Sequence, residues 1–403
     1  MVTMKNLFLY MGFIFVFMTC ENKKNNSEGI PNDDNSEWDL VWSDEFDGSD
    51  VDMSKWNKLL WKPGHVNNEL QAYTDRDTNV YLDNGHLVIQ ALIEPGFWGE
   101  DYNGEEYNSD YTSARLNTDN KANWLYGRFD ISAKLPKGNG SWPAIWMLGE
   151  NISSVGWPHC GEIDIMEHVG FDEGNIHGSI HTTDYNHMLN TQRSGSTTIS
   201  TVTDSFHTYS LEWSPTYLRY LIDNEPFHFI YNDSDGDINK WPFVASQYII
   251  LNLAIGGDWG GINGVDANSF PMKMFVDYVR VSKRKSDIPD INVKFQVDMK
   301  NVNVNSSGIR LSGGDIGSGS PGGLAMSLQS DTTDIWEITL TLPPNSIFTY
   351  KFRNGFFPND WEGGWETVDS NCQVDNNGNR SVVLGDKDTT LLPICFEMCT
   401  ICD

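Results

Sequence analysis

The segment from Trp157 to Gly170 constrains this chain most, because it places three acids within the apolar pattern of a buried strand. Side chains of a strand alternate between its two faces, so Glu162 and Asp164 share one face. Regular alternation would put Glu167 on the other face. One extra residue near Ile165-Met166, a β-bulge, would return Glu167 to the side of the other two acids. The segment therefore predicts three carboxyl groups in a row beside a bulge.

Such a row has a cost that folding alone does not explain, since neighbouring carboxylates repel one another and lose hydration. Retaining glycoside hydrolysis supplies a reason, because it needs two carboxyl groups about 5–5.5 Å apart, one as nucleophile and one as acid/base. Glu162 and Glu167 could reach one sugar ring from the two ends of the row, with Asp164 holding a proton or hydrogen bond between them. The alternative is an exposed acidic strand without a catalytic role.

Residues 37–284 carry the pattern of an all-β domain. Short alternating or apolar runs are separated by Gly, Asn, Asp and Pro, and few helical periodicities exceed two turns. Runs at 86–91, 128–134, 217–222 and 274–281 are typical examples, and a hairpin turn is predicted at Asp223-Asn224-Glu225. A stretch of this length predicts one large antiparallel sandwich.

The N-terminus has the features of an export signal. One lysine precedes the apolar run Leu7 to Met18, which is too short to span a membrane comfortably and ends before Cys20. We expect residues 1–20 to be a lipoprotein-type signal peptide with lipid on Cys20, or otherwise a signal for simple secretion. The polar residues 21–36 predict a flexible tether. The membrane is therefore a predicted partner only through that anchor, and the protein is expected at the outer membrane or cell surface, or secreted.

Charge and aromatic content narrow the range of partners. The chain has 27 Lys and Arg against 56 Asp and Glu, a formal charge of −29, so its surface would repel nucleic acid. Fifteen Trp and fifteen Tyr suggest either carbohydrate stacking or an ordinary aromatic core. We expect a monomer with a polysaccharide partner.

A second domain follows a polar break at 285–291, which contains a proline and is predicted to be a linker. Residues 292–403 contain alternating runs at 292–299, 336–342 and 348–353, which predict a smaller Ig-like β-sandwich. In an exported protein, Cys372, Cys395, Cys399 and Cys402 point to two disulfides, for which three pairings are possible. A zinc site is the less favoured alternative, and Cys160 is left as a buried free thiol.

Several motifs, occurring in order between residues 38 and 284, resemble glycoside hydrolase family 16 in its laminarinase branch. They are Asn67–Thr74, Tyr111–Thr118, Gly140–Gly149, Gly161–Gly170, His177–Thr182 and Leu251–Gly261. The resemblance implies a β-jelly roll with an open concave cleft, in which Glu162 is the nucleophile, Asp164 its helper and Glu167 the acid/base. It also implies the bulged form of the strand, which laminarinases, agarases and carrageenases share and lichenases lack.

The resemblance assigns further residues to substrate. Asn68, Glu69 and Arg115 would bind the sugar on the non-reducing side, and His181 would lie on the leaving-group side. Trp142 and Trp146, four apart along one strand, would share a face and line the cleft floor. Asn252 and Trp259 would lie on or beside the strand below the cleft. Each has a structural alternative as a core or loop residue.

The resemblance also implies a structural Ca²⁺ away from the cleft. Asp277 would give its carboxylate, and Glu45 and Gly85 their backbone carbonyls. Oxygen-only ligation suits Ca²⁺ and not zinc. The alternative is that Asp277 bonds backbone amides with no metal. The C-terminal run Tyr350–Gly355 resembles starch-binding-type modules, in which Phe357, Trp361 and Trp365 could be a glycan platform or core.

These observations predict a secreted retaining endo-hydrolase of β-1,3-glucan (laminarin). One rival is hydrolysis of another marine polysaccharide of the agarose or carrageenan type, although a sulfated substrate calls for more basic residues than Arg115. A rival of another class is a non-catalytic glycan-capturing lipoprotein. A structural surface protein is more distant.

Overall fold

The computed structural model describes residues 37–285, 289–317, 319, 322–330, 333–358 and 363–402. The predicted signal peptide, Cys20 and the tether lie outside these residues, as do Trp361 and part of the predicted linker 285–291. Across the described residues, no helix combines the length and apolar character needed to cross a membrane.

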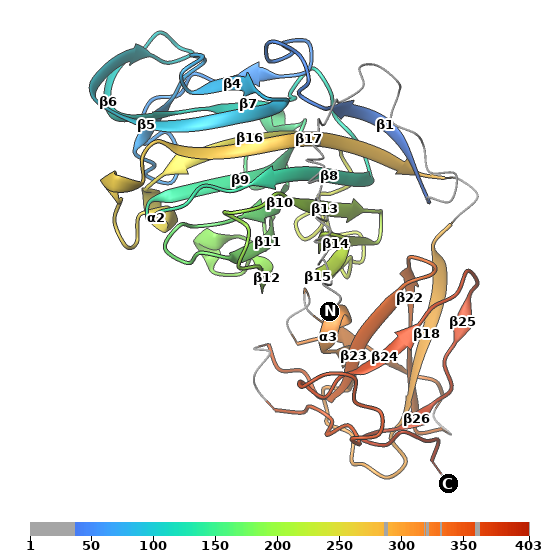
Figure 1. Ribbon diagram of the computed structural model, residues 1–403. Coiled ribbons are helices and arrows are strands. Elements are labelled where there is room, and N and C mark those ends of the chain that lie inside the picture. Colours follow the sequence, from blue (N-terminus) through green and yellow to red (C-terminus); the bar gives the residue numbers. More distant parts are fainter. Residues whose placement is uncertain are drawn as a thin grey trace, which may run out of the picture. The chain divides into compact units, whose positions relative to one another are not determined.

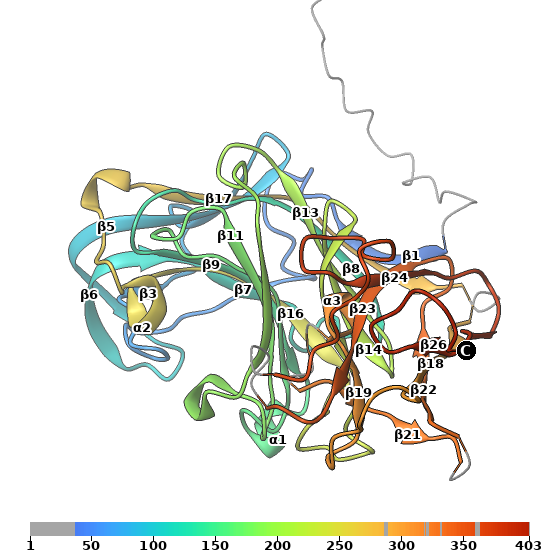
Figure 2. The ribbon, with the colours of Figure 1, turned by 90° about the horizontal axis from the view of Figure 1, so that it is seen from below.

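Two stacked sheets, antiparallel except where β3 (Gln71–Tyr73) runs parallel to β6 (Glu106–Ser113), make up the larger part of the molecule (Figures 1 and 2). The first has the strand order β15 (Glu225–Tyr231), β14 (Tyr217–Ile222), β13 (His207–Trp213), β8 (Gly127–Lys134), β17 (Met272–Arg284), β5 (His86–Glu100), β6 (Glu106–Ser113) and β3 (Gln71–Tyr73), with β1 (Trp38–Asp44) beside β17 and β4 (Val80–Asp83) beside β5. The second has the order β12 (Arg193–Thr198), β11 (Asn175–His181), β10 (Glu162–Glu167), β9 (Ser141–Gly149), β16 (Gln247–Ile255), β7 (Arg115–Asn117) and β2 (Asn57–Lys58).

Helical segments are short and sit in the connections. They are α1 (Ile152–Val155), η1 (His187–Leu189), α2 (Gly257–Gly260), η2 (Ala267–Ser269) and α3 (Gly314–Gly317). The fold is all-β as predicted, with a jelly-roll sandwich as its main body. The predicted hairpin turn is present between β14 and β15. Asp223 and Asn224 both have positive φ (52° and 68°), as a two-residue type I′ turn requires.

The predicted bulge in β10 is confirmed. Against β9, Asp164 pairs with Trp146 and Met166 pairs with Ile145, so one residue of β10, Ile165, has no partner and the register shifts. Side chains on one face of β10 enter the core between the two sheets; they are Ile163, Ile165 and Met166. The three acids are thereby left on the opposite face of the strand.

The C-terminal residues form two smaller sheets. One has the order β21 (Ser327–Leu328), β22 (Ile335–Leu342), β18 (Ile291–Asp298) and β25 (Thr389–Thr390), with β26 (Ile394–Cys395) also beside β18; the other has the order β20 (Leu324–Ala325), β19 (Ile309–Ser312), β23 (Ile347–Asn354) and β24 (Arg380–Val383). Their apolar faces build a second core, which Tyr217 of β14 and Phe229 of β15 also join.

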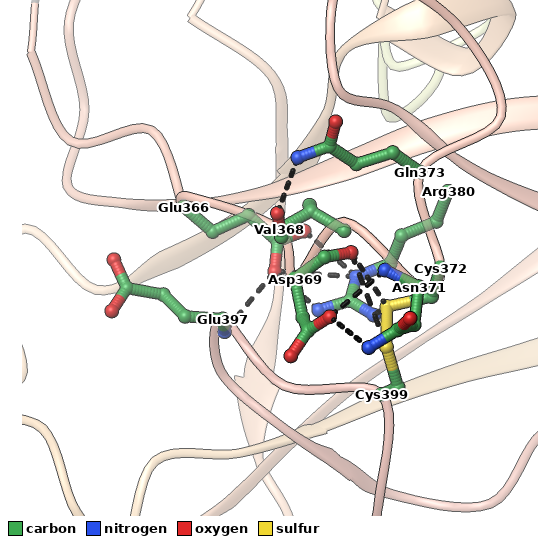
Figure 3. The surroundings of a disulfide bond; sticks show 9 residues. All are labelled: Glu366, Val368, Asp369, Asn371, Cys372, Gln373, Arg380, Glu397 and Cys399. Atoms are coloured by element: carbon green, nitrogen blue, oxygen red, sulfur yellow. Dashed lines mark hydrogen bonds and ion pairs between the residues drawn. A yellow bond between two sulfur atoms is a disulfide. The ribbon is translucent and has the colours of Figure 1, made fainter.

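The four C-terminal cysteines form two disulfides, Cys372–Cys399 and Cys395–Cys402, which selects one of the three pairings left open by the sequence. Cys160 is a buried free thiol, as predicted. Beside the first disulfide, Glu366 and Arg380 form an ion pair that is almost wholly buried (Figure 3).

Candidate active site

The face of the second sheet that carries the acids lines a cavity of about 490 Å³. Its wall contains nearly every residue that the sequence assigned to catalysis or substrate; these are Glu69, Arg115, Trp142, Trp146, Glu162, Asp164, Glu167, His181, Asn252 and Trp259. Five strands, the loop before β3 and the α2 segment therefore bring together residues as far apart in the chain as Glu69 and Trp259. This convergence makes the cavity the candidate active site.

Asn68 is the exception among the predicted substrate residues. The wall contains its neighbour Asn67, while Asn68 is exposed and its side-chain amide donates a hydrogen bond to Asp258 (2.8 Å). Both asparagines have positive φ, so the chain turns sharply here. Gly257 approaches this turn so closely that an added Cβ would lie 2.8 Å from the Asn67 carbonyl oxygen, which explains a glycine at the start of α2.

Each of the three carboxyl groups accepts a hydrogen bond from a neutral donor. The Trp157 indole N–H donates to Glu162 (2.8 Å), the Trp142 indole N–H to Glu167 (3.0 Å), and the Ser179 hydroxyl to Asp164 (2.9 Å). Trp157 was not predicted as a site residue. Because it precedes the strand, alternation along β10 gives no information about where its ring points.

Two of the three acids, Glu162 and Glu167, hold their protons more tightly than an ordinary glutamate. Burial, and then the charge of Asp164, raises the pKa of Glu162 and of Glu167 to about 8. Glu162 and Glu167 therefore resist ionisation near neutral pH. A buried carboxylic acid that keeps its proton near pH 7 is suited to protonate a leaving group.

His181 is the cationic neighbour of the row. Its Nε2 lies 3.3 Å from an Asp164 oxygen and 3.9 Å from a Glu162 oxygen. Burial lowers the pKa of His181, but the hydrogen bond and charge of Asp164 outweigh it and raise the pKa to about 9. The backbone N–H of His187 points at Nδ1 (3.3 Å), so in the neutral ring the proton sits on Nε2, facing the acids.

A chain of hydrogen bonds supports the opposite wall. The Trp146 indole donates to the Asn252 carbonyl oxygen (2.7 Å), the Asn252 amide donates to the Tyr73 hydroxyl (3.1 Å), and that hydroxyl donates to Glu69 (3.1 Å). Arg115 is buried, and its guanidinium carbon lies 4.5 Å from the Trp146 ring centroid. These contacts fix the groups predicted to bind the sugar on the non-reducing side.

Trp259 closes the cavity near Glu167. Its ring meets Trp142 edge-on at 5.5 Å and His177 edge-on at 5.0 Å. The indole that donates to Glu167 is therefore in edge-on contact with a second indole. An aromatic pair of this kind gives a stiff apolar wall, which suits the apolar face of a sugar ring.

The residues predicted to bind calcium lie at one region of the first sheet. The registers of β1 and β5 against β17 bring Glu45 and Gly85 to the part of β17 that holds Asp277. The Asp277 carboxylate lies 3.6 Å from Nε2 of His86, and the Glu45 side chain pairs with Arg280 (2.8 Å). This placement is compatible with one carboxylate and two backbone carbonyls facing a shared ion.

Paired half-buried carboxyl groups, one able to hold a proton, in a cavity walled by indoles and hydrogen-bonding side chains define a glycoside hydrolase. Sequence comparison agrees with this class. The family described as glycosyl hydrolases family 16 matches residues 53–280, and the chain belongs to that family.

Individual relatives match the same part of the chain. A beta-glucanase of Rhodothermus marinus is 47% identical over 252 residues, which cover 60% of this chain and 85% of that protein. A glucan endo-1,3-beta-glucosidase of Cryptopygus antarcticus is 41% identical over 234 residues, covering 56% of this chain and 83% of that protein. The solved laminarinase of Rhodothermus marinus superposes with a TM-score of 0.57 at 44% identity, covering 62% of this chain and 98% of that one.

Proposed function

We propose that this enzyme is a secreted retaining endo-hydrolase of β-1,3-glucan, of the laminarin type. The observation that carries the proposal is the bulge in β10, which leaves Glu162 and Glu167 in one cavity with Asp164 between them. The similar beta-glucanase and endo-1,3-beta-glucosidase supply the substrate class.

In this mechanism, Glu162 attacks the anomeric carbon while Glu167 gives its proton to the leaving oxygen. The glycosidic bond breaks, and a covalent glycosyl-enzyme forms at Glu162. Glu167, now a carboxylate, takes a proton from water, which attacks the anomeric carbon and releases Glu162. Configuration is retained because the carbon is inverted twice.

The surroundings of the two glutamates support these roles. His181 Nε2 lies 3.9 Å from a Glu162 oxygen, and its charge interacts more strongly with Glu162 than with Glu167, so the imidazolium favours the anion at Glu162. The Trp142 indole N–H that donates to Glu167 would stabilise its carboxylate after proton transfer. Asp164 lies between the two glutamates along the strand. Its charge raises the pKa of both, and its carboxyl group accepts a hydrogen bond from the Ser179 hydroxyl.

Two variants test the proposal. Glu162→Gln should lower kcat on laminarin by at least about 10³-fold with the fold intact. Glu167→Ala should regain activity with azide and yield a β-glycosyl azide. An α-glycosyl azide, or full activity of Glu162→Gln, would contradict the assigned roles.

The rival substrates are separated by a product profile on laminarin, curdlan, lichenan and agarose. Among the described residues that line the cavity, Arg115 is the permanent cation, and it is engaged with Trp61 and Trp146. Such a wall favours an uncharged glucan over a sulfated polymer. A reducing-sugar assay on laminarin separates the enzyme from a glycan-capturing lipoprotein, because the latter releases no sugar.

We also propose that Glu45, Gly85 and Asp277 hold a structural Ca²⁺ that joins the N-terminal strand β1 to β17. Chelation should then lower Tm by several degrees, as expected when a bound ligand is removed. Asp277→Asn should remove the response to calcium. Equal Tm values with calcium and with chelator would contradict the site. Export and lipidation at Cys20 remain proposals that mass spectrometry of the mature N-terminus tests.

A further inference from the structure

A row of planar side chains continues outward from the active-site cavity. The guanidinium carbon of Arg115 lies 4.0 Å from the Trp61 ring centroid, and the His65 ring lies 4.1 Å beyond Trp61, tilted by 32°. Tyr102 follows, 6.2 Å from His65 and edge-on at 73°. Arg115 and Val66, the residue after His65, line the cavity. The row therefore begins in the site and leads away from it.

The outer end of this row is held in place by contacts between two loops. The backbone N–H of Tyr102 donates to the Leu60 carbonyl (3.1 Å). Lys62 forms an ion pair with Glu105, and the Asp101 carboxylate accepts the Glu105 backbone N–H (3.0 Å). The turn that carries Tyr102 is thus tied to the loop that carries His65. A surface already fixed in this way loses little conformational entropy when a ligand binds.

The two outer rings are open to solvent and uncharged. Tyr102 is 63% exposed, and His65 is also exposed, whereas Trp61 is half-buried between Arg115 and His65. Partial loss of hydration beside Trp61 and the charge of Arg115 lower the pKa of His65, so the neutral ring predominates at pH 7. Neutral amphipathic rings with polar edges suit a sugar chain, which presents apolar ring faces and hydroxyl groups.

We infer that His65 and Tyr102 form an outer subsite that binds β-glucan units beyond those held by Glu69 and Arg115. This inference rests on the proposed function, because the outer subsite would bind the same β-glucan chain that the active site cleaves. Trp61 acts as a positioning residue, because it supports the His65 ring. The enzyme should therefore prefer long chains over short ones, and cut them at a distance set by this subsite.

The test measures kcat/KM on β-1,3-gluco-oligosaccharides of increasing length and on laminarin. His65→Ala and Tyr102→Ala should lower kcat/KM about 3- to 10-fold on the long substrates and leave the shortest cleaved substrate unchanged. Trp98→Ala is the matched control, because Trp98 is a 55% exposed ring on the same hairpin but lies outside the row.

Some outcomes would overturn the outer subsite alone, and one would overturn the proposed function. A loss that is equal at every substrate length, or no loss at all, overturns the outer subsite. A loss in Trp98→Ala that matches the other two variants also overturns it. A wild-type enzyme that cleaves no β-1,3-glucan of any length would instead overturn the proposed function, and with it this choice of substrate.

Discussion

Buried carboxyl groups are treated in opposite ways in the two sandwiches. In the C-terminal sandwich, Glu366 is 1% exposed and pairs with Arg380 through several short contacts (2.7–3.2 Å). It also accepts the backbone N–H groups of Phe352 and Glu397 (2.8 and 3.3 Å). Figure 3 shows this carboxylate surrounded by donors beside the Cys372–Cys399 disulfide. It is a structural group whose charge is fully compensated.

In the cleft, one imidazole, that of His181, is the cationic neighbour of all three carboxyl groups, and each carboxyl group accepts a hydrogen bond from one neutral donor. No Lys or Arg forms an ion pair with Glu162, Asp164 or Glu167 within the described part of the chain. Burial without a fixed cation raises the pKa of the two glutamates, which harms stability when they ionise but keeps a proton available. An acid without a fixed cationic partner therefore marks the reactive site of this molecule, and an acid paired with a buried arginine marks the scaffold.

The largest expected effect falls on the compensated acid. Glu366→Gln leaves Arg380 buried without a full negative partner, so unfolding free energy should fall by about 3–5 kcal/mol. Thermal or denaturant unfolding, followed by a probe in the C-terminal sandwich, measures this. An effect below about 1 kcal/mol would show that the pair contributes little and would weaken the contrast.

Replacing a glutamate of the cleft should have the opposite effect, a gain in stability at alkaline pH. The pKa of Glu162 is about 8 in the fold against an ordinary 4.5. Its contribution to stability is therefore complete below about pH 4.5 and is lost as the pH rises through 8. Glu162→Gln removes that loss, so its free energy of unfolding should match the wild type near pH 4 and exceed it near pH 8 by on the order of 1–3 kcal/mol, with a higher Tm at pH 8. A lower Tm at pH 8 would contradict the account.

Much of this site was predictable from sequence because strand alternation is a strict rule. Three acids in six residues required either a bulge or an acid pointing into the core, and the bulge is present at Ile165. The choice between Asn67 and Asn68 was not predictable, since both lie in a tight turn whose backbone angles decide which amide faces the cavity. Trp157 was missed for a similar reason, because a loop residue has no periodicity.

The disulfide pairing could not be predicted from the sequence either. Four cysteines at the C-terminal end satisfy three pairings equally well in sequence. The path of the last loops brings Cys372 to Cys399 with a Cα separation of 5.7 Å and Cys395 to Cys402 with 5.1 Å. Those approaches depend on tertiary packing, which no local pattern encodes.

The two indole N–H donors of the cleft, Trp157 and Trp142, should differ in how much they contribute to kcat/KM. Trp157→Phe removes the indole N–H from Glu162, which must be ionised when it attacks, and should cost the reaction about 1.5–3 kcal/mol, since a hydrogen bond to a charged group is lost in that state. Trp142→Phe removes the donor to Glu167, a neutral acid in the free enzyme, and should lower kcat/KM less, by about 10-fold or under. Steady-state kinetics on laminarin compares the two. A larger loss in Trp142→Phe would reverse the assigned charges.

The acid/base role requires Glu167 to hold a proton near neutral pH, and the pH dependence of kcat/KM reports on that proton. Wild-type enzyme on laminarin should lose activity as the pH rises through about 8, because Glu167 then gives up the proton that the leaving group needs. Glu167→Ala rescued by azide should lose that alkaline limb. An alkaline limb that stays unchanged in the rescued variant would show that the proton is held elsewhere, and the account would fail.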